Sequence, residues 1–160
     1  MGSPHLGYMY NSNSLINAGM WLIKQVKGST SLQQLSMTDA PETQNSYLFR
    51  LSQADTLADF KYVILVSSYQ DNYAPHDSCR IQMCSQAAQQ DVHRGKFYLQ
   101  MAENILSGMN CKKLYRLDVN FNIRNTSLAS LIGRTAHILL IECDEFYLNL
   151  IYRYRDVFCE

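Results

Sequence analysis

Two stretches of the chain have hydrophobic patterns that predict β-strands. Residues 60 to 67 are continuously apolar from Val63 to Val66 and rich in β-branched residues. This run is too short for a helix and suits a strand buried on both faces of a parallel sheet. Residues 114 to 121 alternate between apolar and polar side chains, which predicts a second strand.

Other stretches place apolar residues every three or four positions, the period of an α-helix. Residues 11 to 27 follow this period and are bounded by Gly28, a residue that often ends a helix. Two more helices are predicted over residues 79 to 90 and 92 to 108, the second ending in a glycine suited to a left-handed cap.

The remaining segments are shorter. Residues 28 to 45 are rich in polar residues and predict a loop or a short broken helix, and residues 46 to 53 predict a short helix. Asp144 and Glu145 favour the start of a final helix, because acidic side chains stabilise helix N-termini.

The predicted order of helix, strand, helices, strand, helix is typical of an α/β fold, with parallel strands covered by helices. Two strands make an incomplete sheet, because both outer edges stay unpaired. We therefore expect residues 1 to 160 to form a single, partial domain, whose two strands belong to a larger sheet. Its exposed edge favours a protein partner or self-association.

Composition narrows the class of protein. With 160 residues, 47% of them hydrophobic, the chain can form one domain with a core. Its 14 basic and 14 acidic residues cancel, which argues against nucleic-acid binding. No apolar stretch approaches the roughly 20 residues of a membrane span, and no signal sequence is visible. We expect a soluble protein.

The cysteines indicate the compartment. Five cysteines form an odd set without a C-x-x-C pair or a histidine at zinc-ligand spacing. A reducing, cytoplasmic environment, with the cysteines as packing residues, is the simpler interpretation. Neither a metal nor another cofactor is predicted.

Asp71 and His137 are the candidate catalytic residues. Asp71 follows the first predicted strand, and His137 opens the apolar run HILLIE. In a Ser-His-Asp site the carboxylate orients the imidazole, so the two side chains must come within hydrogen-bond distance. Simpler alternatives stay open: Asp71 can be a turn carboxylate, and His137 can be a core histidine beside Ile138.

The other histidines are weaker candidates. His76 and Asp77 lie near Asp71 in the sequence and are interpreted as a surface loop pair. His93 is predicted on the solvated face of a helix, and His5 receives no role.

Three segments carry a family resemblance. GSPHLGYMYNS (2 to 12), LVSSYQDNYAPHDSCRIQMC (65 to 84) and SLIGRTAHI (130 to 138) resemble the C-terminal half of the putative serine esterase family, which are lipase-like α/β-hydrolases. More narrowly, they resemble the C-terminal domain of the large eukaryotic proteins called family with sequence similarity one hundred thirty-five. The resemblance implies the C-terminal portion of an α/β-hydrolase fold. It assigns Asp71 as the acid, in the loop after a late strand, and His137 as the histidine, in the loop after the last strand.

The nucleophile of that family has no counterpart here. In α/β-hydrolases the serine lies on a G-x-S-x-G elbow, and the resemblance implies that GSPHLG follows this elbow. The chain contains no G-x-S-x-G, and Ser3, Ser29 and Ser31 lack the elbow pattern. The N-terminal strands and the oxyanion-hole donors would also belong to the missing half.

The resemblance therefore implies part of a serine esterase or lipase that acts on carboxylic esters, with lipid esters as the expected substrate class. Loss of a nucleophile costs about a millionfold in rate in well-studied hydrolases, so the chain alone is expected to be inactive. The alternative is a non-catalytic module, either truncated or used for binding. A G-x-S-x-G about one βα unit upstream would favour the enzyme, and a natural start at Met1 would favour the module.

Overall fold

The computed structural model describes residues 1–8, 10, 29–55, 57–85, 87, 92–122 and 129–159. The helix predicted over residues 11 to 27 lies outside these residues.

The two predicted strands form a parallel sheet. Strand β1 (Tyr62–Ser67) pairs with β2 (Lys113–Asp118), with Val63 opposite Leu114. The Val119 N–H donates to the carbonyl of Ser67, the last residue of β1, at 2.8 Å and extends the pairing one residue past the end of β2. The parallel pair is confirmed, although β2 ends three residues before the predicted boundary at residue 121.

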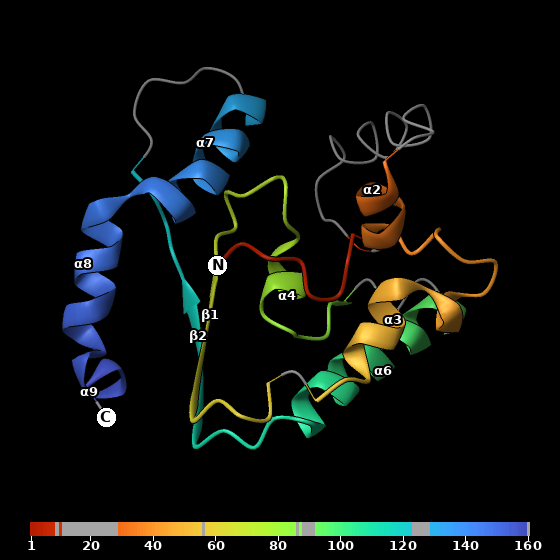
Figure 1. Cartoon of the computed structure of the whole chain (residues 1–160). Helices are drawn as coiled ribbons and strands as arrows, with labels where there is room; N and C mark the ends of the chain where they lie inside the picture. Colours follow the sequence, from red (N-terminus) through yellow and green to blue (C-terminus); the bar gives the residue numbers. More distant parts are fainter. Residues whose placement is uncertain are drawn as a thin grey trace.

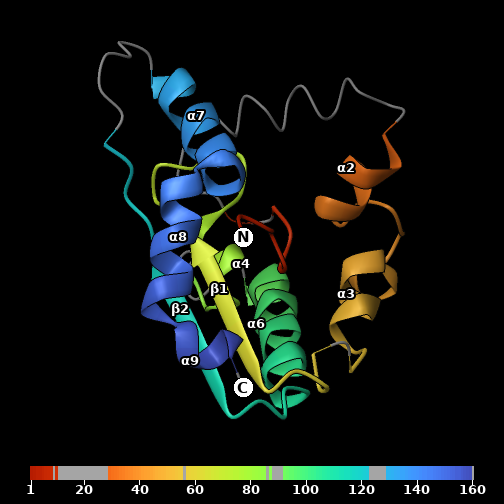
Figure 2. The ribbon, with the colours of Figure 1, turned by 60° about the vertical axis from the view of Figure 1, so that its left-hand side comes forward.

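Helices lie on both sides of this sheet. Helices α8 (Asp144–Arg153) and α9 (Arg155–Phe158) lie on one side of the strands, and α6 (Val92–Ser107) lies on the other (Figure 1, Figure 2). The predicted helices over residues 92 to 108 and from Asp144 onward are thereby confirmed. Mixed helices around a small parallel sheet make this an α/β fold.

The main core lies between β1 and α6. Val63 and Leu65 point to the same face of β1, because alternate residues of a strand do so, and both belong to the buried cluster. Met101 of α6 completes this layer and is fully buried. Helix α3 (Tyr47–Ser52), which was predicted, packs on α6 through an edge-to-face contact of Phe49 with Phe97.

The helix predicted over residues 79 to 90 is wrong at its beginning. Helix α4 covers only His76–Cys79, and residues 80 to 84 are not helical. Ile81 has a φ of 51°, the left-handed conformation, which ends a helix. From β2, Arg116 donates to the carbonyls of Arg80 and Ile81 at 2.8 and 3.3 Å. This side chain supplies hydrogen bonds that would otherwise come from further helical turns.

The face of the sheet toward α8 is less well covered. The expectation of burial on both faces of β1 is wrong at Tyr62 and Ile64, which are only half-buried. A groove of about 750 Å³ separates this face from α8 and α9. Helix α8 has no buried residue, so it packs loosely on the strands.

The remaining elements are short helices and α7. Helix α2 (Thr30–Leu35) and a 3₁₀ turn, η1 (Thr43–Asn45), agree with the loop or broken helix predicted there. Helix α7 (Ala129–Glu142) precedes α8. Within the described part of the chain, no helix has the length and apolar character needed to span a bilayer.

Candidate active site

Asp71 lies in the loop that follows β1, where its own hydrogen bonds shape the turn. Its Oδ1 accepts hydrogen bonds from the backbone N–H groups of Tyr73 and Ala74, at 2.7 and 3.1 Å. Its backbone N–H donates to the carbonyl of Ser68 at 3.2 Å. An aspartate whose side chain accepts a hydrogen bond from the backbone two residues ahead stabilises such turns. The interpretation of Asp71 as a turn carboxylate therefore holds for its Oδ1.

The second oxygen of Asp71 contacts His137. Asp71 Oδ2 lies 2.7 Å from His137 Nδ1, although 66 positions separate the two residues in the chain. The Asp71 side chain is 1% exposed and that of His137 is 32% exposed. The structure therefore brings the two candidate residues together, with a buried carboxylate behind a partly accessible imidazole.

His137 reaches this position from a helix and not from a loop. The resemblance implied a histidine in the loop after the last strand, but His137 lies within α7, in its second half. The reason is local: ASLIGRTAHILLIE, the α7 sequence, contains mostly residues that helices accommodate, and it has no proline to interrupt it.

This geometry defines what the imidazole can do. We assign the proton of the short contact to Nδ1, because a buried carboxylate is an acceptor. The neutral ring then has Nε2 as an acceptor, and Nε2 makes no hydrogen bond to the described residues. The ring of Tyr73 lies 5.5 Å from the imidazole, centroid to centroid, and covers one side of it. Such an imidazole is oriented to accept a proton through Nε2.

The N-terminal segment closes the site from another direction. Gly2 has a φ of 57°, and its N–H donates to the carbonyl of Val66 at 3.0 Å. A Cβ built on Gly2 would lie 3.5 Å from Asp71 Oδ2 and 3.6 Å from His137 Nδ1. The segment GSPHLG therefore starts directly beside the carboxylate–imidazole contact.

Neighbouring titratable groups show the low polarity of this region. Burial raises the pKa of Cys79 to about 12, and the negative charge of Asp71 adds to the effect. Burial and the same carboxylate also raise the pKa of Tyr8. Burial lowers the pKa of His5, which favours its neutral form. Asp71 is the acidic charge that acts on both Cys79 and Tyr8.

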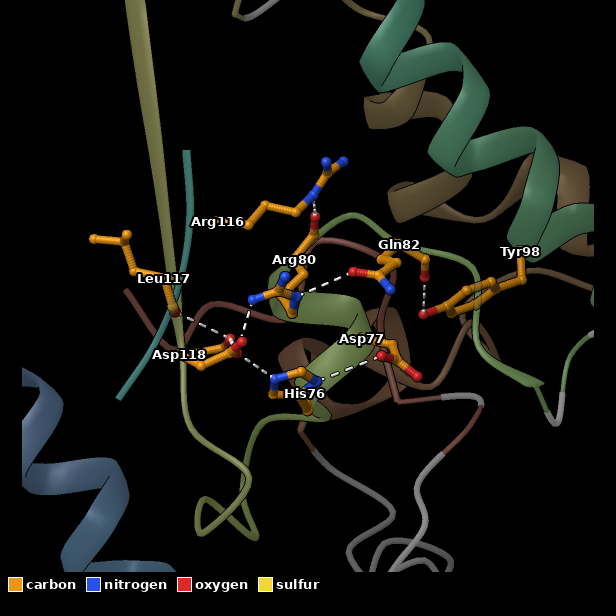
Figure 3. A network of polar contacts seen from close by, with 9 residues as sticks. His76, Asp77, Arg80, Gln82, Tyr98, Arg116, Leu117 and Asp118 are labelled. Atoms are coloured by element: carbon orange, nitrogen blue, oxygen red, sulfur yellow. Dashed lines mark hydrogen bonds and ion pairs between the residues drawn. The ribbon is translucent and has the colours of Figure 1, made fainter. Parts of the chain in front are cut away.

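A second histidine–carboxylate contact lies at the C-terminal ends of the strands (Figure 3). Asp118 Oδ1 lies 2.6 Å from His76 Nε2 and 2.7 Å from Arg80 Nη1, and it accepts a hydrogen bond from Ser67 Oγ at 3.2 Å. His76 Nδ1 is 3.4 Å from Asp77 Oδ1. We call Ser67, His76, Arg80 and Asp118 the Asp118 cluster.

The Asp118 cluster corrects the sequence interpretation of His76 and Asp77 as a surface loop pair. The His76 side chain is only 12% exposed, and its shorter contact is with Asp118. Partial desolvation raises the pKa of Asp118, but the His76 hydrogen bond and the charge of Arg80 outweigh it and leave the pKa lowered. A signal for this cluster existed, because Asp118 lies toward the C-terminal end of a predicted strand, and the C-terminal ends of parallel strands lie at the same edge of a sheet.

None of the three serines considered from the sequence contacts the imidazole. Ser3 is exposed and its Oγ bonds the carbonyl of Met1. Ser29 caps α2, where it accepts from the N–H of Leu32, and Ser31 lies on the exposed side of that helix. The side chain of His93 lies outside the described residues.

The described side chains also include no group of three histidine, cysteine or acidic residues that could hold a metal ion.

Comparison with known protein families matches residues 1 to 85 to the family described as putative serine esterase. The chain belongs to this family. The match includes Gly2 and Asp71 and ends before α7. No solved structure gives a significant match to the chain.

Proposed function

We propose that this chain supplies the acid and the histidine of a serine esterase triad, with Asp71 as the acid and His137 as the base. The observation that carries the proposal is the 2.7 Å contact between Asp71 Oδ2 and His137 Nδ1. Membership of a serine esterase family supports the same assignment. The partial exposure of the imidazole, 32%, leaves it accessible to a reacting group.

In this proposal Asp71 keeps the proton on Nδ1, and His137 accepts the proton of a serine hydroxyl through Nε2. The same imidazole then donates that proton to the leaving alkoxide. The serine would come from a segment outside this chain, and the chain by itself would be inactive. The substrate would be a carboxylic ester of a lipid or of a small apolar alcohol, as the resemblance implies.

We place the chain in the C-terminal part of an α/β-hydrolase domain, close to the proteins called family with sequence similarity one hundred thirty-five. A parallel pair of strands, with Asp71 in the loop that follows β1, agrees with this placement. A cytoplasmic location agrees with the cysteines, since all five lie among the described residues and none forms a disulfide.

The second candidate is a non-catalytic module derived from the hydrolase fold. The absence of a G-x-S-x-G from the sequence favours it. Under this alternative the Asp71–His137 contact is structural and fixes α7 against the loop.

The contact itself is tested with Asp71→Asn. The carboxamide no longer fixes the proton on Nδ1, so the favoured tautomer of the imidazole should change. Long-range proton–nitrogen NMR spectra of histidine-labelled protein report the tautomer directly. We expect the Nδ1–H form of His137 in the natural chain and a shift toward Nε2–H in Asp71→Asn.

The matched control is Asp77→Asn, which changes the same type of side chain six residues away and contacts His76 instead. It should leave the His137 tautomer unchanged. An identical tautomer in the natural chain and in Asp71→Asn would contradict the proposed dyad. In a complete enzyme, Asp71→Asn should lower kcat by about 10⁴-fold, the cost of losing the triad acid elsewhere.

A further inference from the structure

A second contact joins the two segments that carry the proposed dyad. Asn72 follows Asp71 in the loop, and Gly133 precedes His137 by four residues, about one turn, on α7. Residues four apart lie on the same face of a helix. The loop and the helix therefore meet twice, once at Asp71–His137 and once at Asn72–Gly133.

The Asn72–Gly133 contact leaves no room for a side chain at position 133. A Cβ built on Gly133 would lie 2.1 Å from Asn72 Nδ2, 2.3 Å from its Cγ and 2.4 Å from its Cβ. The Cβ of Asn72 cannot rotate away, because the backbone fixes its position. The backbone next to it is held in turn by the two hydrogen bonds that the N–H groups of Tyr73 and Ala74 donate to Asp71 Oδ1.

A glycine inside a helix has a cost. It destabilises a helix interior by about 1 kcal/mol relative to alanine. Gly133 is buried and lies five residues into α7, so it is not a helix cap. The close approach of Asn72 is the feature of this structure that requires a residue without a Cβ.

We propose that Gly133 is a positioning residue that sets the distance between α7 and the acid loop, and so lets His137 reach Asp71. The inference rests on the proposed function of the dyad. A side chain at position 133 would move the helix outward. Hydrogen bonds weaken steeply beyond about 3.2 Å, so an outward movement of about 1 Å would break a contact that is now 2.7 Å long.

The test compares Gly133→Ala with Arg134→Ala, an exposed neighbour on the same helix. Both substitutions favour helix formation or leave it unchanged, so circular dichroism should show α7 retained in each. The readout is the His137 tautomer in long-range proton–nitrogen NMR spectra. We expect the Nδ1–H form to be lost in Gly133→Ala, as in Asp71→Asn, and kept in Arg134→Ala.

Rescue separates positioning from general damage. In Gly133→Ala combined with Asn72→Gly, the three atoms nearest the new methyl group are gone, and the Nδ1–H form should return. Combination with Asn72→Ala keeps the Cβ at 2.4 Å and should not restore it fully. If Gly133→Ala alone fails to fold, the Gly133→Ala/Asn72→Gly variant still decides the matter, because a folded double variant without the Nδ1–H form contradicts the proposal.

The outcomes also separate this inference from the proposed function. A Gly133→Ala protein that keeps the natural tautomer, while Asp71→Asn loses it, overturns the role of Gly133 and leaves the dyad intact. A natural chain whose tautomer is the same as that of Asp71→Asn overturns the dyad and the inference together.

Discussion

Asp71 combines two roles that looked like alternatives in the sequence. Its Oδ1 bonds two backbone N–H groups of its own turn, and its Oδ2 contacts His137. A carboxylate has about four acceptor sites, so one role does not exclude the other. The turn fixes the orientation of the carboxylate, and this orientation directs Oδ2 toward the imidazole.

The contribution of Asp118 to the stability of the folded chain should depend on pH. Its pKa is lowered from the ordinary 3.8 by the His76 hydrogen bond and the Arg80 charge, which outweigh desolvation. A lowered folded pKa stabilises the protein above 3.8, and this stability is lost as the pH falls through the folded value. Asp118→Asn should therefore lower the free energy of unfolding at pH 7 by up to about 1 kcal/mol, since the side chain is 47% exposed.

Urea unfolding at pH 7 and at pH 3 measures this difference. The gap between Asp118→Asn and the natural chain should narrow at the lower pH. The control is Asp156→Asn, whose carboxylate is 96% exposed and pairs only with Arg155 in the described structure, and which should have little effect. A gap of the same size at both pH values would contradict the assigned role of Asp118.

At the scale of elements, β1 has two different edges. One edge pairs with β2, and on this edge the Ser67 carbonyl accepts a hydrogen bond from the Val119 N–H. The carbonyl of the preceding residue, Val66, points to the other edge and accepts a hydrogen bond from the Gly2 N–H. Beyond Gly2, no described strand pairs with the second edge. The groove beside α8 and α9 lies along this strand. Two of its lining residues are half exposed to solvent, Ile151 at 50% and Phe158 at 53%. An open edge beside exposed apolar side chains favours association.

We therefore expect the chain to self-associate through this groove. Ile151→Lys should weaken the association, because it introduces a charge into the groove, and sedimentation velocity over a range of concentrations measures the change. Leu148→Lys is the matched control, since Leu148 lies on the same helix, is 68% exposed and does not line the groove. Equal weakening by both substitutions would mean that charge on α8, and not this groove, controls association.

At the scale of the molecule, the structure brings the Asp71 carboxylate and the His137 imidazole together from distant segments. Helix α7, the loop after β1 and the N-terminal Gly2 meet at one place, and membership of a serine esterase family gives this meeting a chemical interpretation. A triad also requires a hydroxyl nucleophile and oxyanion donors. The sequence contains no elbow that could provide the nucleophile.

Labelling with a fluorophosphonate probe, which reacts with activated serines, tests whether the chain lacks the nucleophile of a triad. The chain should remain unlabelled, because its sequence has no G-x-S-x-G and no serine in the described part of the chain hydrogen-bonds His137. A longer protein that carries a G-x-S-x-G ahead of this sequence should be labelled on that serine, and His137→Ala should abolish the labelling. Clear labelling of the present chain on any serine would contradict the proposal, and an elbow-bearing protein that stays unlabelled would favour the non-catalytic module.

Much of the fold could be predicted because its signals are local. The apolar run in β1 and the helical period of α6 and α8 depend on neighbouring residues, so these elements appear at the predicted places. The helix predicted from residue 79 was wrong because Arg116, from a distant strand, bonds the carbonyls at residues 80 and 81. The position of His137 in a helix was missed because the family resemblance, and not the local sequence, suggested a loop.

The sequence by itself determined the two strands, the helices α3, α6 and α8, which acid and which histidine are candidates, and that no serine elbow is present. These depend on residue type and short-range spacing. Only the tertiary structure decided that Asp71 and His137 touch, that His76 pairs with Asp118, and that Gly133 faces Asn72. Such contacts depend on how the helices pack against the sheet, and a shift of about 1 Å in that packing makes or breaks a hydrogen bond.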